Sequence, residues 1–122
     1  AAAAKGDLKI LAVTALTSLD QGDLNDMGFL CDVQDLVVSR ARRALAAGCD
    51  GIVTSGLELE RIRSEVNRKL VIVAPGIRPV ENRSTDDQKR IVSVEQAFQM
   101  GADHIVVGRP IKNAANPRQA AE

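Results

Sequence analysis

Two arginines that closely follow a glycine are the side chains of this sequence best suited to hold an anion. Arg109 comes directly after Gly108, and Arg78 comes two positions after Gly76. Glycine allows backbone N–H groups to approach phosphate oxygens, and a guanidinium group adds a bidentate, charge-assisted hydrogen bond. The spacing therefore favours a phosphate site. The alternative is that these glycines only end strands and that the arginines face solvent.

Other kinds of reactive site find little support in the sequence. His104 is the only histidine and precedes the apolar residues of its segment, so we expect it to have a structural role at the amino end of a strand. Without a second histidine or a cysteine cluster, we expect no metal site. Because His104 would lie at the end of the barrel away from the ligand site, we also expect no Ser-His-Asp arrangement. Cys31 and Cys49 form no C-x-x-C pair, and we expect both to be reduced thiols in a cytoplasmic protein. We also expect no cofactor.

A long polar stretch, residues 79–90, has no apolar pattern. A loop of this length within a compact domain is more often a functional lid than an idle connection. We therefore expect these residues to form a lid. A disordered connection is the alternative.

The elements that would position these residues begin with four short apolar runs rich in β-branched side chains. These are residues 10–16, 51–54, 70–74 and 104–107. None alternates strictly between apolar and polar residues, which is typical of parallel strands buried on both faces. Helical spacing predicts helices over residues 33–47, 57–66 and 93–100, the end of a helix over residues 1–4, and the start of another at residues 116–117. We expect the charged side chains of these helices to face solvent.

The alternation of strands and helices predicts an α/β fold with a parallel sheet and right-handed crossovers. Residues 46–53 and 99–106 share the order of helix end, glycine, small residue, aspartate and strand. Such repeats suit a barrel or a doubly wound sheet. Four βα units make half of an eight-unit barrel, so we expect residues 1–122 to form one partial (β/α)8 TIM barrel domain. Both glycine-arginine segments then fall at the carboxyl ends of strands, where ligands of these folds bind.

The composition argues against two classes of partner. Lys plus Arg and Asp plus Glu number 16 each, so the formal net charge is zero and no basic field for nucleic acid arises. Aromatic residues make up 2% of the chain, too few for stacking platforms. No apolar run approaches the roughly 20 residues of a membrane span. We therefore expect neither nucleic acid nor a membrane as a partner.

Five segments occur in an order and spacing that resemble bacterial orotidine 5′-phosphate decarboxylase. They are residues 13–18, 50–55, 74–79, 87–90 and 101–111. The set is specific, although each segment alone would be a weak signal. The resemblance implies the C-terminal half of the barrel, strands 5 to 8. It also implies a lyase of de novo pyrimidine biosynthesis, which converts orotidine 5′-phosphate into uridine 5′-phosphate (UMP) and carbon dioxide without a metal or organic cofactor.

The resemblance implies roles for single residues as well. Thr17 and Ser18 would lie at the pyrimidine, and the backbone around Pro75 would line the base pocket. The 5′-phosphate would be held by Arg78, Gln88, Gly108 and Arg109. Residues 79–88 would close over that phosphate.

The family's chemistry depends on a D-x-K-x-x-D motif, which this sequence matches only in part. The match that begins at Asp7 continues to Ala12, and the one that begins at Asp87 continues to Val92. Neither supplies the second carboxylate. We therefore assign no catalytic residue to this chain and expect it to be inactive alone.

Two other classes of protein remain open at this point. One is another phosphate-binding barrel enzyme, such as a sugar-phosphate epimerase or synthase, and the other is a non-catalytic half-barrel. A four-stranded piece of a barrel would leave two strand edges and an apolar inner face open. We therefore expect a homo-oligomer, such as a homodimer, or association with a matching N-terminal half.

Overall fold

The computed structural model describes residues 1–78 and 92–122 and contains one parallel four-stranded sheet. The strands lie in chain order, β1 (Leu11–Val13), β2 (Gly51–Val53), β3 (Val71–Ala74) and β4 (His104–Ile105). Each pairs in parallel with the next, for example Ile52 with Ile72. The predicted α/β fold with a parallel sheet is confirmed.

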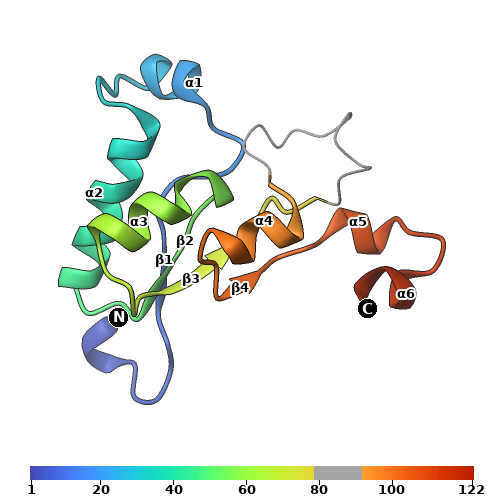
Figure 1. Ribbon diagram of the computed structural model, residues 1–122. Coiled ribbons are helices and arrows are strands. Elements are labelled where there is room, and N and C mark those ends of the chain that lie inside the picture. The colour runs from blue at the N-terminus through green and yellow to red at the C-terminus, as the bar shows by residue number, and fades with distance from the viewer. Residues whose placement is uncertain (79–91) are drawn as a thin grey trace.

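The helices connect these strands and lie mainly in one layer. They are η1 (Ala2–Ala4), α1 (Gln21–Asp26), α2 (Val33–Ala46), η2 (Gly56–Glu58), α3 (Leu59–Glu65), α4 (Val94–Gln99), α5 (Arg109–Lys112) and α6 (Pro117–Ala121). In Figure 1, α2, α3 and α4 cover one face of the sheet, while α5 and α6 lie beyond the end of β4. The three longer predicted helices are thus present, the second of them beginning as a 3-10 turn. The segment at residues 1–4 is a short 3-10 helix rather than the end of an α-helix.

The hydrophobic core lies between the sheet and this helix layer. Ile52 and Ile72 point into it from the strands and are fully buried. Val37 of α2 and Ile62 of α3 meet them from the helices and are equally inaccessible. Short aliphatic side chains fill the core because the chain has almost no aromatic residues.

The opposite face of the sheet is apolar and exposed. Val13 on β1 is 59% exposed, and Val106, just beyond β4, is 49% exposed. The apolar runs are typical of strands buried on both faces, but this face is open in the described residues, as expected for a four-stranded piece of a barrel. The reason is that α2, α3 and α4 all pack on the other side, so the apolar side chains that a closed barrel would turn inward remain uncovered.

The predicted sequence repeat corresponds to a repeated contact at the amino ends of the strands. Gly48 and Gly101 end α2 and α4 with positive φ angles of 84° and 106°. Asp50 then accepts a hydrogen bond from the Ile10 N–H at 2.8 Å. In the second copy, Asp103 accepts one from the Ile72 N–H at 2.8 Å. Each aspartate thereby links its own strand to the strand beside it.

A cation completes each of these two contacts. Lys5 lies 2.5 Å from Asp50, and Arg63 lies 2.7 Å from Asp103. The hydrogen bond from Lys5, followed by that from the Ile10 N–H, lowers the pKa of Asp50. Partial burial raises the pKa of Asp103, but the Ile72 N–H and Arg63 outweigh burial and bring that pKa below 3.8.

Arg63 departs from the expectation that the helix charges face solvent. Its side chain is 18% exposed. The guanidinium donates two hydrogen bonds to the Gly101 carbonyl at 2.6 and 2.8 Å and one to the Leu70 carbonyl at 2.6 Å. It thus ties α3 to the end of α4 and to the residue before β3. Carbonyl groups that the fold brings together accept hydrogen bonds from this guanidinium and compensate for its loss of solvent. The helical sequence pattern does not reveal these carbonyl groups, because they belong to other segments.

Candidate functional site at the carboxyl ends of the strands

The segment after β1 forms a tight turn around the first pair of predicted site residues. The Leu19 N–H donates to the Leu16 carbonyl at 3.1 Å, which leaves Thr17 and Ser18 as the two central residues of the turn. Thr17 is 8% exposed, and Ser18 is half-buried. The strand itself ends at Val13, earlier than the predicted limit at residue 16, because the chain must leave the sheet to form this turn.

The segment after β2 holds a buried glutamate that the sequence pattern did not reveal. Ser55 is fully buried and accepts a hydrogen bond from the Leu57 N–H at 3.1 Å, so that it caps η2. Glu58 is 1% exposed, although we expected it to face solvent. The position of Glu58 shortly after the end of β2 could have indicated this burial, because the carboxyl ends of the strands form the edge where such folds bind ligands.

The end of β3 places Pro75 and Arg78 at the same edge. Pro75 is half-buried, and Gly76 has a φ of 75°, a conformation that favours glycine. The Arg78 N–H donates to the Val92 carbonyl at 3.1 Å, so the residues on either side of the undescribed segment lie next to each other. Arg78 is only 6% exposed, and its Nη1 donates to the Ile77 carbonyl at 3.0 Å.

The end of β4 presents Gly108 and Arg109 at the surface. Pairing with β3 extends one residue beyond β4, since the Val106 N–H donates to the Ala74 carbonyl at 3.0 Å. Gly108 then precedes α5, and a side chain added there would meet no atom of the described residues within 4 Å. Both Gly108 and Arg109 are exposed. The backbone at Gly108 is therefore accessible to a ligand.

The sheet order decides which predicted residues come together. Because β3 and β4 are neighbours, Arg78 and Arg109 follow adjacent strand ends on one edge of the sheet. Thr17 and Ser18 follow β1, the outer strand on the other side. Gln88 and the predicted lid at residues 79–90 lie outside the residues that the structure describes.

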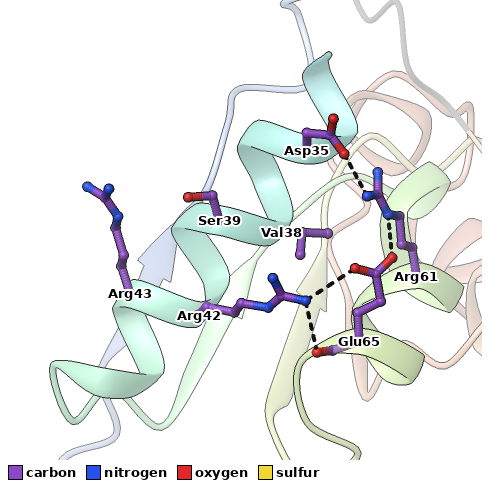
Figure 2. A pocket seen from close by; sticks show the side chains of 7 residues that line it. All are labelled: Asp35, Val38, Ser39, Arg42, Arg43, Arg61 and Glu65. Atoms are coloured by element: carbon purple, nitrogen blue, oxygen red, sulfur yellow. Dashed lines mark hydrogen bonds and ion pairs between the residues drawn. The ribbon is translucent and has the colours of Figure 1, made fainter. Parts of the chain in front are cut away.

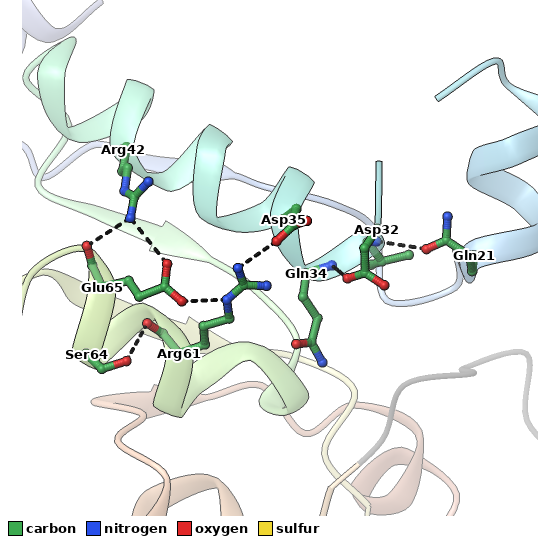
Figure 3. Close-up of polar contacts among 9 residues, drawn as sticks. Gln21, Asp32, Gln34, Asp35, Arg42, Arg61, Ser64 and Glu65 are labelled. Carbon is green, nitrogen blue, oxygen red and sulfur yellow. Dashed lines mark hydrogen bonds and ion pairs between the residues drawn. The ribbon is translucent and has the colours of Figure 1, made fainter. Parts of the chain in front are cut away.

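A separate groove of about 450 Å³ lies in the helix layer between α2 and α3. Figure 2 shows the residues that line it, Asp35, Val38, Ser39, Arg42, Arg43, Arg61 and Glu65. Arg61 lies 2.6 Å from both Asp35 and Glu65, and Arg42 lies 3.3 Å from Glu65 (Figure 3). These charges neutralise one another and join two helices. We therefore interpret the groove as a packing contact and not as a ligand site.

Two further searches concern the described residues only. Residues 1–78 and 92–122 contain no group of three or more His, Cys, Asp or Glu side chains that could hold a metal ion. In the same part of the chain, no helix has the length and apolar character needed to cross a membrane.

Comparison with known proteins places this arrangement among decarboxylases. A sequence model described as "Orotidine 5'-phosphate decarboxylase / HUMPS family" matches residues 1–122. An orotidine 5'-phosphate decarboxylase of Methylococcus capsulatus is 69% identical over 122 residues, which are 100% of this chain and 50% of that protein. The protein of the same name from Stenotrophomonas maltophilia is 51% identical over 121 residues, 99% of this chain and 50% of that one.

Solved structures show the same likeness. The crystal structure of orotidine 5'-phosphate decarboxylase from Lactobacillus acidophilus matches with a TM-score of 0.74 at 34% identity, covering 92% of this chain and 45% of that chain. The enzyme from Pyrococcus horikoshii matches with a TM-score of 0.66 at 27% identity, covering 93% and 47%. This chain thus spans about half the length of the relatives that it matches.

Proposed function

Because this chain belongs to the orotidine 5′-phosphate decarboxylase / HUMPS family, we propose that it forms the phosphate-binding half of an enzyme that converts orotidine 5′-phosphate into UMP and carbon dioxide. The observation that carries the proposal is the position of Gly108 and Arg109. They are exposed at the end of β4, next to the end of β3 and its arginine.

The phosphate contributes to catalysis although it is remote from the reacting carbon. Binding energy from a non-reacting part of a substrate can lower the barrier when the enzyme uses it to orient and desolvate the reacting part. We assign the binding of the phosphate to the backbone N–H groups at Gly108 and to the guanidinium of Arg109. The buried Arg78 contributes positive charge beside them, and Gln88 stays a predicted phosphate ligand.

The pyrimidine is assigned to the turn after β1 and to the backbone after β3. Thr17 and Ser18 are the central residues of a hydrogen-bonded turn, and Pro75 precedes the left-handed Gly76. Both segments follow strands at the edge where parallel α/β folds bind ligands. This supports the assignment of Thr17, Ser18 and Pro75 to the base.

The reacting groups are assigned to the remaining half of the relatives' length. This sequence contains no complete D-x-K-x-x-D motif. The lysine that protonates the carbon and the carboxylates that position it must then come from outside residues 1–122. No metal or organic cofactor is needed for this assignment.

The experiment that tests the phosphate assignment is Arg109→Ala in an enzyme that joins this chain to the other barrel half. A charged hydrogen bond to phosphate contributes roughly 1.5–3 kcal/mol, so we expect kcat/KM for orotidine 5′-phosphate to fall by about ten- to a hundredfold. Orotidine without the phosphate should be affected much less. Arg118→Ala is the matched control, because the Arg118 side chain is 90% exposed and its one ion pair among the described residues is with Glu122. An equal penalty on both substrates would make Arg109 a structural residue.

The exposed face of the sheet supports a proposal about partners. Val13, Val106 and the half-buried Val73 between them lie on one apolar face, and β1 and β4 each leave an unpaired edge among the described residues. We assign this face either to a second copy of the chain or to the complementary N-terminal half, each of which would close eight strands. If the isolated chain sedimented as a monomer at micromolar concentration, the assignment of this face to a second copy would be rejected.

The cytoplasm is the proposed location. Cys31 and Cys49 are both free and half-buried, as reduced cysteines commonly are. Reducing compartments keep such thiols unpaired.

A further inference from the structure

We propose that Arg40 is a positioning residue that fixes the Thr17–Ser18 turn for recognition of the pyrimidine. The proposal rests on the proposed base-binding role of that turn. Arg40 lies on α2, and its Nη1 donates a hydrogen bond to the Thr14 carbonyl at 2.6 Å. Thr14 comes only two residues before Leu16, where the turn begins.

The Thr14 carbonyl lies where the β1–β2 pairing ends. The backbone N–H and the hydroxyl of Thr14 both donate to the Val53 carbonyl, each at 3.1 Å. Within the described residues, this is the last backbone hydrogen bond between the two strands. The guanidinium of Arg40 therefore takes the place of a further backbone donor. It holds the orientation of the Thr14 peptide group at the point where the chain leaves the sheet.

A second contact ties the same guanidinium to the chain beyond the turn. Arg40 lies over the ring of Phe29, 5.6 Å from its centroid, a distance typical of a cation–π contact. Phe29 follows α1 and packs against the core. One side chain thus contacts the residues before the turn and the segment that follows α1.

The far side of the turn is anchored to the start of the same helix. Gln21, two residues after the turn closes at Leu19, accepts a hydrogen bond from the Val33 N–H at 2.9 Å and donates to the Cys31 carbonyl at 3.1 Å. Figure 3 shows its side chain directed at the beginning of α2. Because α2 holds both flanks of the turn, removal of the Arg40 anchor should loosen the turn without unfolding the helix.

The test compares two substitutions of Arg40 in the joined enzyme, with Arg43 as the control. Arg40→Met keeps the length of the side chain but removes its donors and charge, whereas Arg40→Lys keeps a cationic donor. Arg43 lies one turn further along α2, is exposed and makes no side-chain hydrogen bond or ion pair within the described part of the chain. Arg43→Met therefore makes the same chemical change on the same helix without touching the turn.

We expect Arg40→Met to lower kcat/KM by about three- to tenfold. Loss of a fully buried charged hydrogen bond would lower kcat/KM further, but Arg40 is partly exposed and solvent screens its charge. The penalty should be equal for orotidine 5′-phosphate and for orotidine, since the affected site is the base and not the phosphate. The Kd for uridine should rise by a similar factor. Arg40→Lys should stay within about twofold of the wild type, and Arg43→Met should be unchanged.

Two results would overturn the proposal. In the first, Arg40→Met has a lower Tm, but its kcat/KM and its Kd for uridine equal those of the wild type at a temperature where the variant is folded. Arg40 would then have a purely structural role. The other is a penalty confined to the phosphate-bearing substrate. Failure of the proposed function would look different, because the wild type itself would then not decarboxylate orotidine 5′-phosphate. In that case the uridine Kd of the Arg40 and Arg43 variants still decides the role of Arg40.

Discussion

The two ends of the same sheet use charged residues in opposite ways. At the amino ends of the strands, Asp50 and Asp103 bind neighbouring backbone N–H groups, and Lys5 and Arg63 neutralise them. At the carboxyl ends, the Gly108–Arg109 segment is exposed, and the backbone at Gly108 has open space around it. The amino ends hold adjacent strands together, whereas the carboxyl ends carry the exposed groups that we propose bind a ligand.

This contrast teaches that similar motifs must be interpreted by the end of the strand on which they lie. A glycine close to a charged residue occurs at both ends, as Gly101 two positions before Asp103 ahead of β4 and as Gly108 directly before Arg109 after it. Asp103 is paired with the Ile72 N–H and with Arg63. Arg109 lies at the edge of the sheet where parallel α/β folds bind ligands. Stability and binding are therefore expected to respond to different substitutions.

The largest effect should follow from separating the chain from its catalytic complement. The isolated chain should show no decarboxylation of orotidine 5′-phosphate above background, because its sequence contains no complete D-x-K-x-x-D motif. Addition of a matching N-terminal half should restore part of the activity. A stopped or continuous assay of carbon dioxide release measures both. A kcat for the isolated chain within about tenfold of a complete family member would contradict the division of roles.

The next effect concerns the amino ends. Arg63→Met should lower the free energy of unfolding by about 2 kcal/mol, since it leaves the partly buried carbonyl groups of Gly101 and Leu70 without a charged donor. Urea unfolding of the joined enzyme measures this change. Arg118→Met, at the exposed C-terminal helix, should stay within about 0.5 kcal/mol. Similar losses for the two variants would show that the Arg63 contacts contribute nothing particular.

The smallest effect is a pH dependence. The pKa of Asp103 is lower in the folded state than its ordinary value of 3.8, so ionised Asp103 stabilises the fold above about pH 4. That contribution is lost as the pH falls through the folded-state pKa. The difference in unfolding free energy between wild type and Asp103→Asn should therefore narrow between about pH 6 and pH 3. Asp26→Asn at the end of α1 is the control, because Asp26 is exposed and makes no side-chain hydrogen bond or ion pair among the described residues. If the difference in unfolding free energy between wild type and Asp103→Asn grew as the pH fell, the stabilising role of ionised Asp103 would be refuted.

The sequence was informative wherever a pattern is local. Four β-branched runs predicted four strands, and the glycine-aspartate repeat corresponds to two equivalent contacts. The order of βα units then placed Arg78 and Arg109 at neighbouring strand ends. These features depend on residues close in the chain and on the regular handedness of parallel crossovers.

The sequence failed where tertiary partners decide the outcome. Glu58 and Arg63 have the residue types of a solvated helix, and the carbonyl groups that bury Arg63 come from two other segments. The helix α1 was not predicted because only Leu24 of its six residues is buried, and because its capping box uses Asp20 and Asp23. The open apolar face of the sheet, by contrast, was expected from the half-barrel, although the apolar runs alone are typical of strands buried on both faces.

The most direct test of the contrast between the two ends is the affinity for UMP relative to uridine. Isothermal titration would give both Kd values for wild type, Arg109→Ala and Arg63→Met of the joined enzyme, at a temperature where all three are folded. We expect Arg109→Ala to reduce the preference for the phosphate-bearing nucleotide by about tenfold or more, and Arg63→Met to leave it within about twofold. An unchanged preference in Arg109→Ala, or an equal loss in Arg63→Met, would contradict the account.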